Sequence, residues 1–134
     1  LENEAARAFA GPWSLGTLAL VARRPDTRLD ALARGAAMLE GGCVSHNQLW
    51  FYRDAIEASL RAGDHKAAAD FAGKLQAFTA PEPLGWSSLY IDLAQCVAEG
   101  HTAQARAERA VIGDRATDAG LSLCARLAEE LAAA

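Results

Sequence analysis

The fold of this chain is decided by two stretches that repeat one pattern, LRAGDHKAAADFAGKL at residues 60–75 and VAEGHTAQARAERAVI at residues 97–112. Each stretch contains a turn that begins with glycine, at Gly63 in the first and at Gly100-His101 in the second, and the two turns lie 37 residues apart. An alanine follows each turn at the same offset, inside a run of residues typical of a helix. A period of this length predicts stacked helical hairpins, because one hairpin buries its apolar face only when a neighbouring hairpin covers it.

The same 37-residue register extends across most of the chain. It places Trp13 opposite Trp50, and it aligns small or apolar residues in three successive units. These aligned sets are Leu15 with Tyr52 and Leu89, Ala19 with Ile56 and Leu93, Ala31 with Ala68 and Ala105, and Met38 with Leu75 and Ile112. Alanine is abundant and β-branched residues are sparse, which favours closely packed helices over a sheet. The sequence therefore predicts an all-α fold in which one helical hairpin is used about three times.

Glycine and proline residues mark where the helices are expected to end and begin. The Gly11-Pro12 pair predicts a break after a first helix, and Gly113 within a later helix predicts a bend or a close approach of another helix. The expected helices are residues 2–10, 13–23, 27–40, from a cap at Ser45 or Asn47 to Ala62, 65–79, 86–99, 102–119 and 122–132. The expected hairpins are about 12–42, 45–80 and 85–119, with a capping helix at about 121–133, all in a single domain of residues 1–134.

The composition is that of one globular domain, with 134 residues of which 51% are hydrophobic and 22% are charged. The net charge of -4 argues against nucleic acid as a partner, because phosphate binding needs a basic surface. No apolar run approaches the length of about 20 residues that a membrane span needs. Three widely spaced cysteines do not suggest a disulfide framework, so a reducing cytoplasm fits best. Because the chain starts at Leu1 already in a helical pattern, we expect it to be part of a longer protein.

A helical hairpin with small residues at its contacts, a Gly-Asp turn and a following proline resembles the tetratricopeptide repeat. More specific is the stretch GCVSHNQLWFYRDAIE at residues 42–57, followed by Gly63-Asp64, by Thr79 and by EPLGW at residues 82–86. This combination resembles the C-terminal repeat region of large bacterial proteins that join a class III adenylate/guanylate cyclase domain to an ATPase module and a helical tail. The resemblance covers roughly residues 25–132. The chain departs from that family at Gly85, where proline is common, and at His65, where tryptophan is common.

This resemblance implies a right-handed α-solenoid of tetratricopeptide-like hairpins that serves as a regulatory or partner-binding tail. Catalysis does not carry over, because the chain has no G-x-x-x-x-G-K-[ST] phosphate loop and no counterpart of the cyclase's metal-binding aspartates. No cofactor is expected for the same reason. The expected partner is a protein or peptide, or another domain of the parent chain.

The helix that ends at Ala62 carries the strongest candidate site. On a helical wheel its apolar residues form one broad face, and the opposite face combines a tryptophan with charged residues. The residues of this second face are His46, Trp50, Arg53, Asp54, Glu57 and Arg61. In a tetratricopeptide-like stack this face lines the ligand groove, so we predict that Trp50 is an aromatic anchor and that its charged neighbours are polar contacts. The alternative is that Trp50 packs beneath the preceding repeat while Arg53 pairs with Glu57 across one helical turn.

Two other kinds of site are not expected. Cys43 and His46 have a C-x-x-H spacing, but they supply only two of the four ligands of a tetrahedral zinc site, so no metal is predicted. No nucleophile, base and orienting group converge at a recognisable spacing, so this domain is not predicted to be an enzyme. The expected function is therefore non-catalytic regulation or protein interaction in a nucleotide cyclase-type signalling protein.

Two rival functions remain open at this point. One is the repeat domain of a bacterial ATPase-type transcription regulator, which binds a small effector, and the other is a purely structural spacer. A homodimer through exposed repeat faces is also compatible with the sequence.

Overall fold

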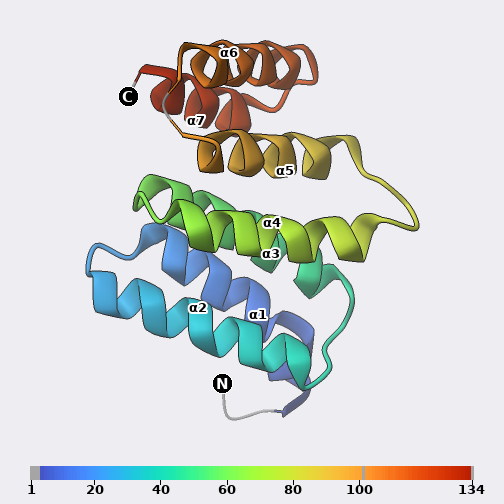
Figure 1. The fold of residues 1–134 in the computed structure, drawn as a ribbon. Helices are drawn as coiled ribbons and strands as arrows, with labels where there is room; N and C mark the ends of the chain where they lie inside the picture. The colour runs from blue at the N-terminus through green and yellow to red at the C-terminus, as the bar shows by residue number, and fades with distance from the viewer. Residues whose placement is uncertain (1–3, 101, 134) are drawn as a thin grey trace.

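The computed structural model describes residues 4–100 and 102–133, and within these residues every regular element is an α-helix (Figure 1). The helices are α1 (Glu4–Val21), α2 (Pro25–Glu40), α3 (His46–Arg61), α4 (His65–Thr79), α5 (Gly85–Ala98), α6 (Ala103–Asp118) and α7 (Ser122–Ala133). The prediction of an all-α fold is confirmed. His101, which belongs to the second expected turn, lies outside the described residues.

Neighbouring helices pack in pairs, α1 with α2, α3 with α4 and α5 with α6, and α7 packs on α6. The odd-numbered helices also contact one another in order, from α1 through α3 and α5 to α7. In Figure 1 the pairs follow one another along a column, with α1 and α2 at one end and α6 and α7 at the other. The odd-numbered helices therefore form a continuous layer, and this layer carries the candidate site.

The 37-residue register corresponds to a repeat of buried positions. Ala31, Ala68 and Ala105 are all buried, each in the second helix of its pair, where a small side chain lets the two helices approach closely. The other residues of the four sets that align in three successive units are also buried, apart from Met38, which is only partly covered. These buried residues are Leu15, Ala19, Tyr52, Ile56, Leu75, Leu89, Leu93 and Ile112. The same apolar positions in each unit thus build one continuous core.

Helix α3 is buried over most of its surface, because α1, α2, α4 and α5 all contact it. Its Phe51 is fully buried and lies against two glycines. A Cβ at Gly35 of α2 would lie 2.1 Å from Phe51 Cε2, and a Cβ at Gly16 of α1 would lie 3.2 Å from Phe51 Cα. The missing side chains at these two positions let α1 and α2 close on the aromatic ring.

Helix α1 runs without interruption through Pro12, so the predicted break at Gly11-Pro12 is wrong. A proline inside a helix removes one backbone N–H donor and pushes away the carbonyl four residues earlier, which here belongs to Ala8. That carbonyl accepts hydrogen bonds from Val44 N–H at 3.3 Å and from Asn47 Nδ2 at 3.1 Å. The groups that the proline releases therefore find partners outside the helix.

Asn47, which is fully buried at the start of α3, forms two further hydrogen bonds with the backbone of α1 near Pro12. Its Nδ2 also donates to the Phe9 carbonyl at 2.9 Å, and its Oδ1 accepts from the backbone N–H of Trp13 at 3.3 Å. In a regular α-helix the Trp13 N–H donates to the Phe9 carbonyl. The continuity of α1 was not predicted, because the side chain that bonds both of these groups comes from a residue far away in the sequence.

The last two helices are joined through Gly113 and Arg109. Gly113 of α6 faces α7, where an added Cβ would lie 3.5 Å from Ala128 Cβ, so the predicted close helix approach is confirmed. The buried guanidinium of Arg109 donates to the Leu131 carbonyl at 2.8 Å and to the Gly100 carbonyl. These carbonyls lie at the C-terminal ends of α7 and α5, where the helix dipole favours a cation.

Candidate functional site

Three tryptophans from successive odd-numbered helices form a row along their shared layer. Trp13 of α1 and Trp50 of α3 have ring centroids 6.2 Å apart, and Trp50 and Trp86 of α5 are stacked at 5.7 Å with only 8° between their planes. Trp13 is 42% exposed, whereas Trp50 and Trp86 are half-buried. We call Trp13, Trp50 and Trp86 the tryptophan row.

Trp86 was not predicted as part of the site. A shift of 37 residues from Trp50 reaches Ser87, so the strict register misses Trp86 by one residue. The signal that could have found it is the near-regular recurrence of tryptophan at positions 13, 50 and 86. Leu89 keeps the 37-residue register with Tyr52, so Trp86 lies one residue earlier within its helix than Trp50 does, and a fixed shift misses it.

Arg53 covers one face of the row. Its guanidinium carbon lies 4.9 Å from the centroid of the Trp50 ring, which is a cation–π distance. Its Nε and Nη2 donate to Asp54 Oδ1 at 2.9 and 2.6 Å, and Thr17 Oγ1 of α1 donates to Asp54 Oδ2 at 3.0 Å. Asp54 is 1% exposed, so its carboxylate orients Arg53 and joins α3 to α1 without itself reaching a ligand.

Glu57 and Arg61, two further charged residues of the predicted face, form ion pairs within the fold. Glu57 is 5% exposed and accepts from Arg61 Nε at 2.9 Å, and Arg61 Nη1 donates to Glu130 of α7 at 2.7 Å. Arg61 therefore ties α3 to α7. The wheel placed Asp54 and Glu57 on the face that lines a groove, but neighbouring helices cover both of them. The predicted alternative pair is also not formed, because Arg53 pairs with Asp54 and Glu57 pairs with Arg61.

His46 and Cys43 both have structural contacts at the entry to α3. His46 Nε2 lies 2.9 Å from the Phe9 carbonyl, and its ring meets the Phe9 ring edge-on at 5.2 Å. Cys43 Sγ donates to the Met38 carbonyl at 3.2 Å. Across residues 4–100 and 102–133 there is no cluster of three or more His, Cys, Asp or Glu side chains that could hold a metal ion. Of the six predicted residues, Asp54 and Glu57 are buried, whereas His46, Trp50, Arg53 and Arg61 are at least partly exposed. His46 and Arg61 have the contacts described above, and Trp50 and Arg53 are the two that line a cavity.

A cavity of about 300 Å³ adjoins Trp50 and Trp86 at the start of α7. We call it the α7 cavity. One wall consists of side chains from α3 and α5, and the other is the turn between α6 and α7 with the first residues of α7. The residues that line the α7 cavity are Trp50, Arg53, Trp86, Tyr90, Gly120, Leu121, Ser122, Leu123 and Cys124.

Two titratable groups of the α7 cavity are held in their neutral forms. Burial, followed by the nearby charge of Glu57, raises the pKa of the Cys124 thiol from 9.0 to about 11. Burial and the same carboxylate also raise the pKa of the Tyr90 hydroxyl well above its usual value. Tyr90 is 5% exposed, and its ring meets the Trp86 ring edge-on at 6.4 Å. Both groups remain protonated near neutral pH, so Arg53 is the charged group of this lining.

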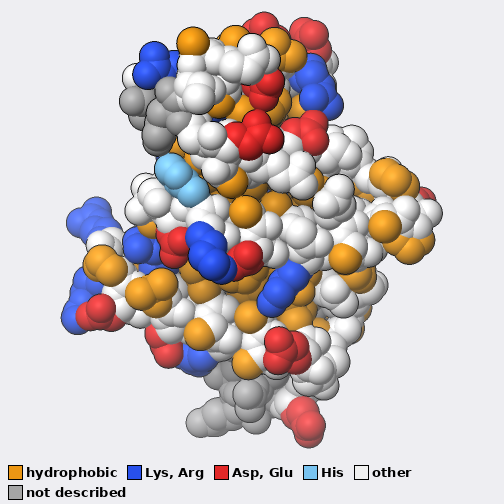
Figure 2. Space-filling view, in the orientation of Figure 1, with side chains coloured by type: hydrophobic (Ala, Val, Ile, Leu, Met, Phe, Trp, Pro, Cys, Tyr) orange, Lys and Arg blue, Asp and Glu red, His pale blue; other side chains and the backbone are white. Residues whose placement is uncertain are grey.

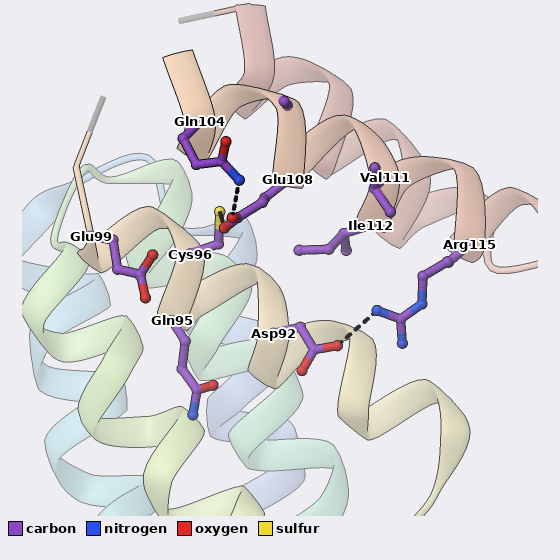
Figure 3. Close-up of a pocket in the computed structure, with 10 residues that line it drawn as sticks. Asp92, Gln95, Cys96, Glu99, Gln104, Glu108, Val111, Ile112 and Arg115 are labelled. Carbon is purple, nitrogen blue, oxygen red and sulfur yellow. Dashed lines mark hydrogen bonds and ion pairs between the residues drawn. The ribbon is translucent and has the colours of Figure 1, made fainter. Parts of the chain in front are cut away.

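A second cavity, of about 410 Å³, lies between α5 and α6 (Figure 3). Its polar side chains largely bond to one another, as Figure 3 shows: Arg115 donates to Asp92 at 3.0 Å and Gln104 donates to Glu108 at 2.7 Å. Acidic side chains gather over α5 and α6 on the face seen in Figure 2, whereas both signs of charge are mixed over α2 and α4. Four of the polar side chains that line this second cavity are therefore already paired with one another.

No protein-family model, no curated protein and no solved structure matches this chain. Among the residues that the structure describes, no helix is long and apolar enough to cross a membrane.

Proposed function

We propose that this chain is a non-catalytic regulatory domain that binds a protein or peptide along the tryptophan row. Its hairpins would form a right-handed, tetratricopeptide-like α-solenoid capped by α7. The observation that carries the proposal is the stacking of Trp50 on Trp86, with the exposed Trp13 continuing the row. Tryptophan and arginine are enriched among the residues that contribute most to protein interfaces.

The row suits an extended or helical segment of a partner. It runs across α1, α3 and α5, so a partner laid along it would contact three repeat units. Aromatic rings offer large contact area at a low cost in conformational entropy, and Arg53 adds a cationic group that Asp54 already orients. The parent that we propose is a nucleotide cyclase-type signalling protein of the cytoplasm. Its support is the resemblance of residues 42–57 and 82–86, together with three free cysteines.

The experiment is selection of binding peptides from a random library on the intact domain, followed by affinity measurements on variants. Trp13→Ala should preserve the fold, because Trp13 is substantially exposed, and should weaken the selected peptides by about 2 kcal/mol, or about 30-fold. Leu29→Ala is the matched control, because it removes an exposed apolar side chain from α2, away from the row. Equal loss in both variants, or no loss in either, would count against the row as the binding surface.

A second candidate function is that of a repeat domain that senses a small effector. The specific observation in its favour is the α7 cavity, whose volume of about 300 Å³ lies at the lower end of the range of small-molecule sites. Arg53 and Trp50 belong to both the row and this cavity, so an effector bound there would affect the partner surface directly.

A further inference from the structure

The lining of the α7 cavity is largely aromatic and apolar. Trp50 and Trp86 form a stacked pair on one side, and Tyr90 meets Trp86 edge-on. Leu121 and Leu123 contribute apolar surface from the opposite side, and Leu123 is largely exposed at this edge. Such surroundings favour an aromatic ligand, which can make stacked or edge-on contacts with these rings.

The start of α7 adds unused backbone donors to the α7 cavity. The residue before the helix is Leu121, which has no side-chain acceptor that could cap it. The first backbone bond at this end runs from Ala125 N–H to the Leu121 carbonyl at 3.0 Å, and the N–H groups of residues 122–124 bond to no described residue. These same residues line the α7 cavity. A helix N-terminus of this kind favours a negatively charged oxygen.

Tyr90 provides an independent indication of a ligand. The residue is almost completely buried, yet its hydroxyl forms no hydrogen bond with any residue in the described part of the chain. The hydroxyl lies within electrostatic range of Glu57, Cys124 and Arg53, and the last two of these line the cavity. Because this hydroxyl has no partner, it can donate a hydrogen bond to a ligand oxygen in the cavity.

The charges around the cavity favour one negative charge over two, because Arg53 is already paired with Asp54. Arg53 uses Nε and Nη2 on Asp54, which leaves Nη1 without a partner among the described residues. The N-terminus of α7 contributes roughly half a positive charge. Asp54 and Glu57 lie buried nearby, each paired with an arginine, and they would repel a dianion such as phosphate. A carboxylate is therefore favoured over a phosphate group.

We propose that the α7 cavity binds a small aromatic monocarboxylic acid. Its ring lies beside Trp50 and Trp86, and its carboxylate accepts hydrogen bonds from the first N–H groups of α7, from the Tyr90 hydroxyl and from Arg53 Nη1. This inference rests on the small-effector function, and it names the ligand class for that function. Such a ligand bridges α3, α5 and α7 and therefore fixes α7 relative to the tryptophan row.

The experiment uses three compounds that share one phenyl ring: phenylacetate, phenylacetamide and 2-phenylethylammonium. Binding to the intact chain is followed by calorimetry and by the combined fluorescence of its three tryptophans. Phenylacetate should bind, the neutral amide should bind about ten-fold more weakly or worse, and the cation should not bind measurably. Equal binding of acid and amide, or tightest binding of the cation, overturns the proposal. Failure of all three to bind also overturns it.

Variants separate this inference from peptide binding by the row. Tyr90→Phe should weaken phenylacetate about ten-fold, because it removes one donor to a charged oxygen, whereas Tyr52→Phe, a buried tyrosine of α3 that does not line the cavity, should not. Trp13→Ala should weaken the selected peptides and leave phenylacetate binding unchanged. A peptide that ends in phenylalanine is tested with a free and with an amidated C-terminus. If the free peptide binds the cavity and phenylacetate does not, the ligand is a chain terminus and the small-acid proposal is wrong.

Discussion

The contacts around Phe51 and the contacts around Trp86 differ in how completely side chains fill them. Where α1 and α2 meet α3, a methyl group at Gly35 would lie only 2.1 Å from the ring of Phe51. Where α3 and α5 meet the start of α7, the side chains leave a cavity of about 300 Å³ beside Trp86. Glycines let the backbones close on one aromatic ring in the first region, whereas several aromatic rings and a turn enclose space in the second. The first region can fix the shape of the repeat array, and the second has room for a ligand.

The largest expected effect tests the close packing of the first region. Gly35→Ala should lower the free energy of unfolding by about 3 kcal/mol or more, because Phe51 is fully buried and has no free space to move into. Urea unfolding followed by circular dichroism measures the change. Gly73→Ala in α4 is the control: no atom lies within 4 Å of the added Cβ, so helix propensity alone should make it about 1 kcal/mol more stable. A Gly35→Ala protein as stable as the original would show that the contact is not tight.

The next effect concerns the hydrogen bonds that Asn47 forms with the backbone of α1 near Pro12. Asn47→Ala should cost about 2–3 kcal/mol, because the Trp13 N–H loses the Asn47 acceptor and three carbonyls, those of Ala8, Phe9 and Val44, lose one donor each. In a Pro12→Ala background the helix regains the N–H that the proline removed, so the cost of Asn47→Ala should become smaller. This double-mutant cycle is measured by the same urea unfolding. An identical cost in both backgrounds would mean that Asn47 does not serve the proline.

A third effect belongs to the second region and depends on pH. Because the pKa of Cys124 is raised from 9.0 to about 11, the folded protein holds a proton that the unfolded chain releases between these values. The stability from this neutral thiol is fully present below pH 9 and is lost as the pH rises to about 11, by roughly 2 kcal/mol. Cys124→Ala should therefore lose less stability over this pH range than the original chain. Parallel curves for the two proteins would contradict the buried position of Cys124.

The smallest effect compares the close contact at Gly35 with the contact between α6 and α7. Gly113→Ala places its Cβ 3.5 Å from Ala128 Cβ, which is an ordinary contact, so the gain in helix propensity should stabilise the chain by up to about 1 kcal/mol. The same substitution thus has opposite signs at Gly35 and at Gly113. Thermal unfolding of both variants measures the difference. Destabilisation at Gly113 comparable to that at Gly35 would show that the α6/α7 contact is as tight as the contact around Phe51.

The sequence predicted the features that depend on local pattern and period. The all-α class and the buried alanines at positions 31, 68 and 105 follow from the 37-residue register, because apolar periodicity and glycine turns act locally. The continuity of α1 was missed, because it depends on the amide of Asn47 from another helix. The right-handed solenoid and the cyclase-type parent stay predictions.

The candidate site was predicted only in part. Trp50 and Arg53 follow from an unusual residue composition on one helical face, but the burial of Asp54 and Glu57 depends on which helices cover that face. The α7 cavity depends on residues 120–124 lying against α3 and α5, and no period or local motif specifies that contact. The parts of the site that the sequence did not predict therefore depend on packing between segments that are far apart in the chain.

The central claim is that ligands bind along the tryptophan row and its adjoining cavity. The most direct measurement is the nuclear magnetic resonance spectrum of the ¹⁵N-labelled chain, in which the three indole N–H signals of Trp13, Trp50 and Trp86 are followed during titration. With a selected peptide, we expect all three indole signals to shift, and with phenylacetate we expect Trp50, Trp86 and the backbone signals of residues 122–124 to shift. Shifts confined to the α5/α6 groove or to α2 and α4, with the indole signals unmoved, would contradict the claim.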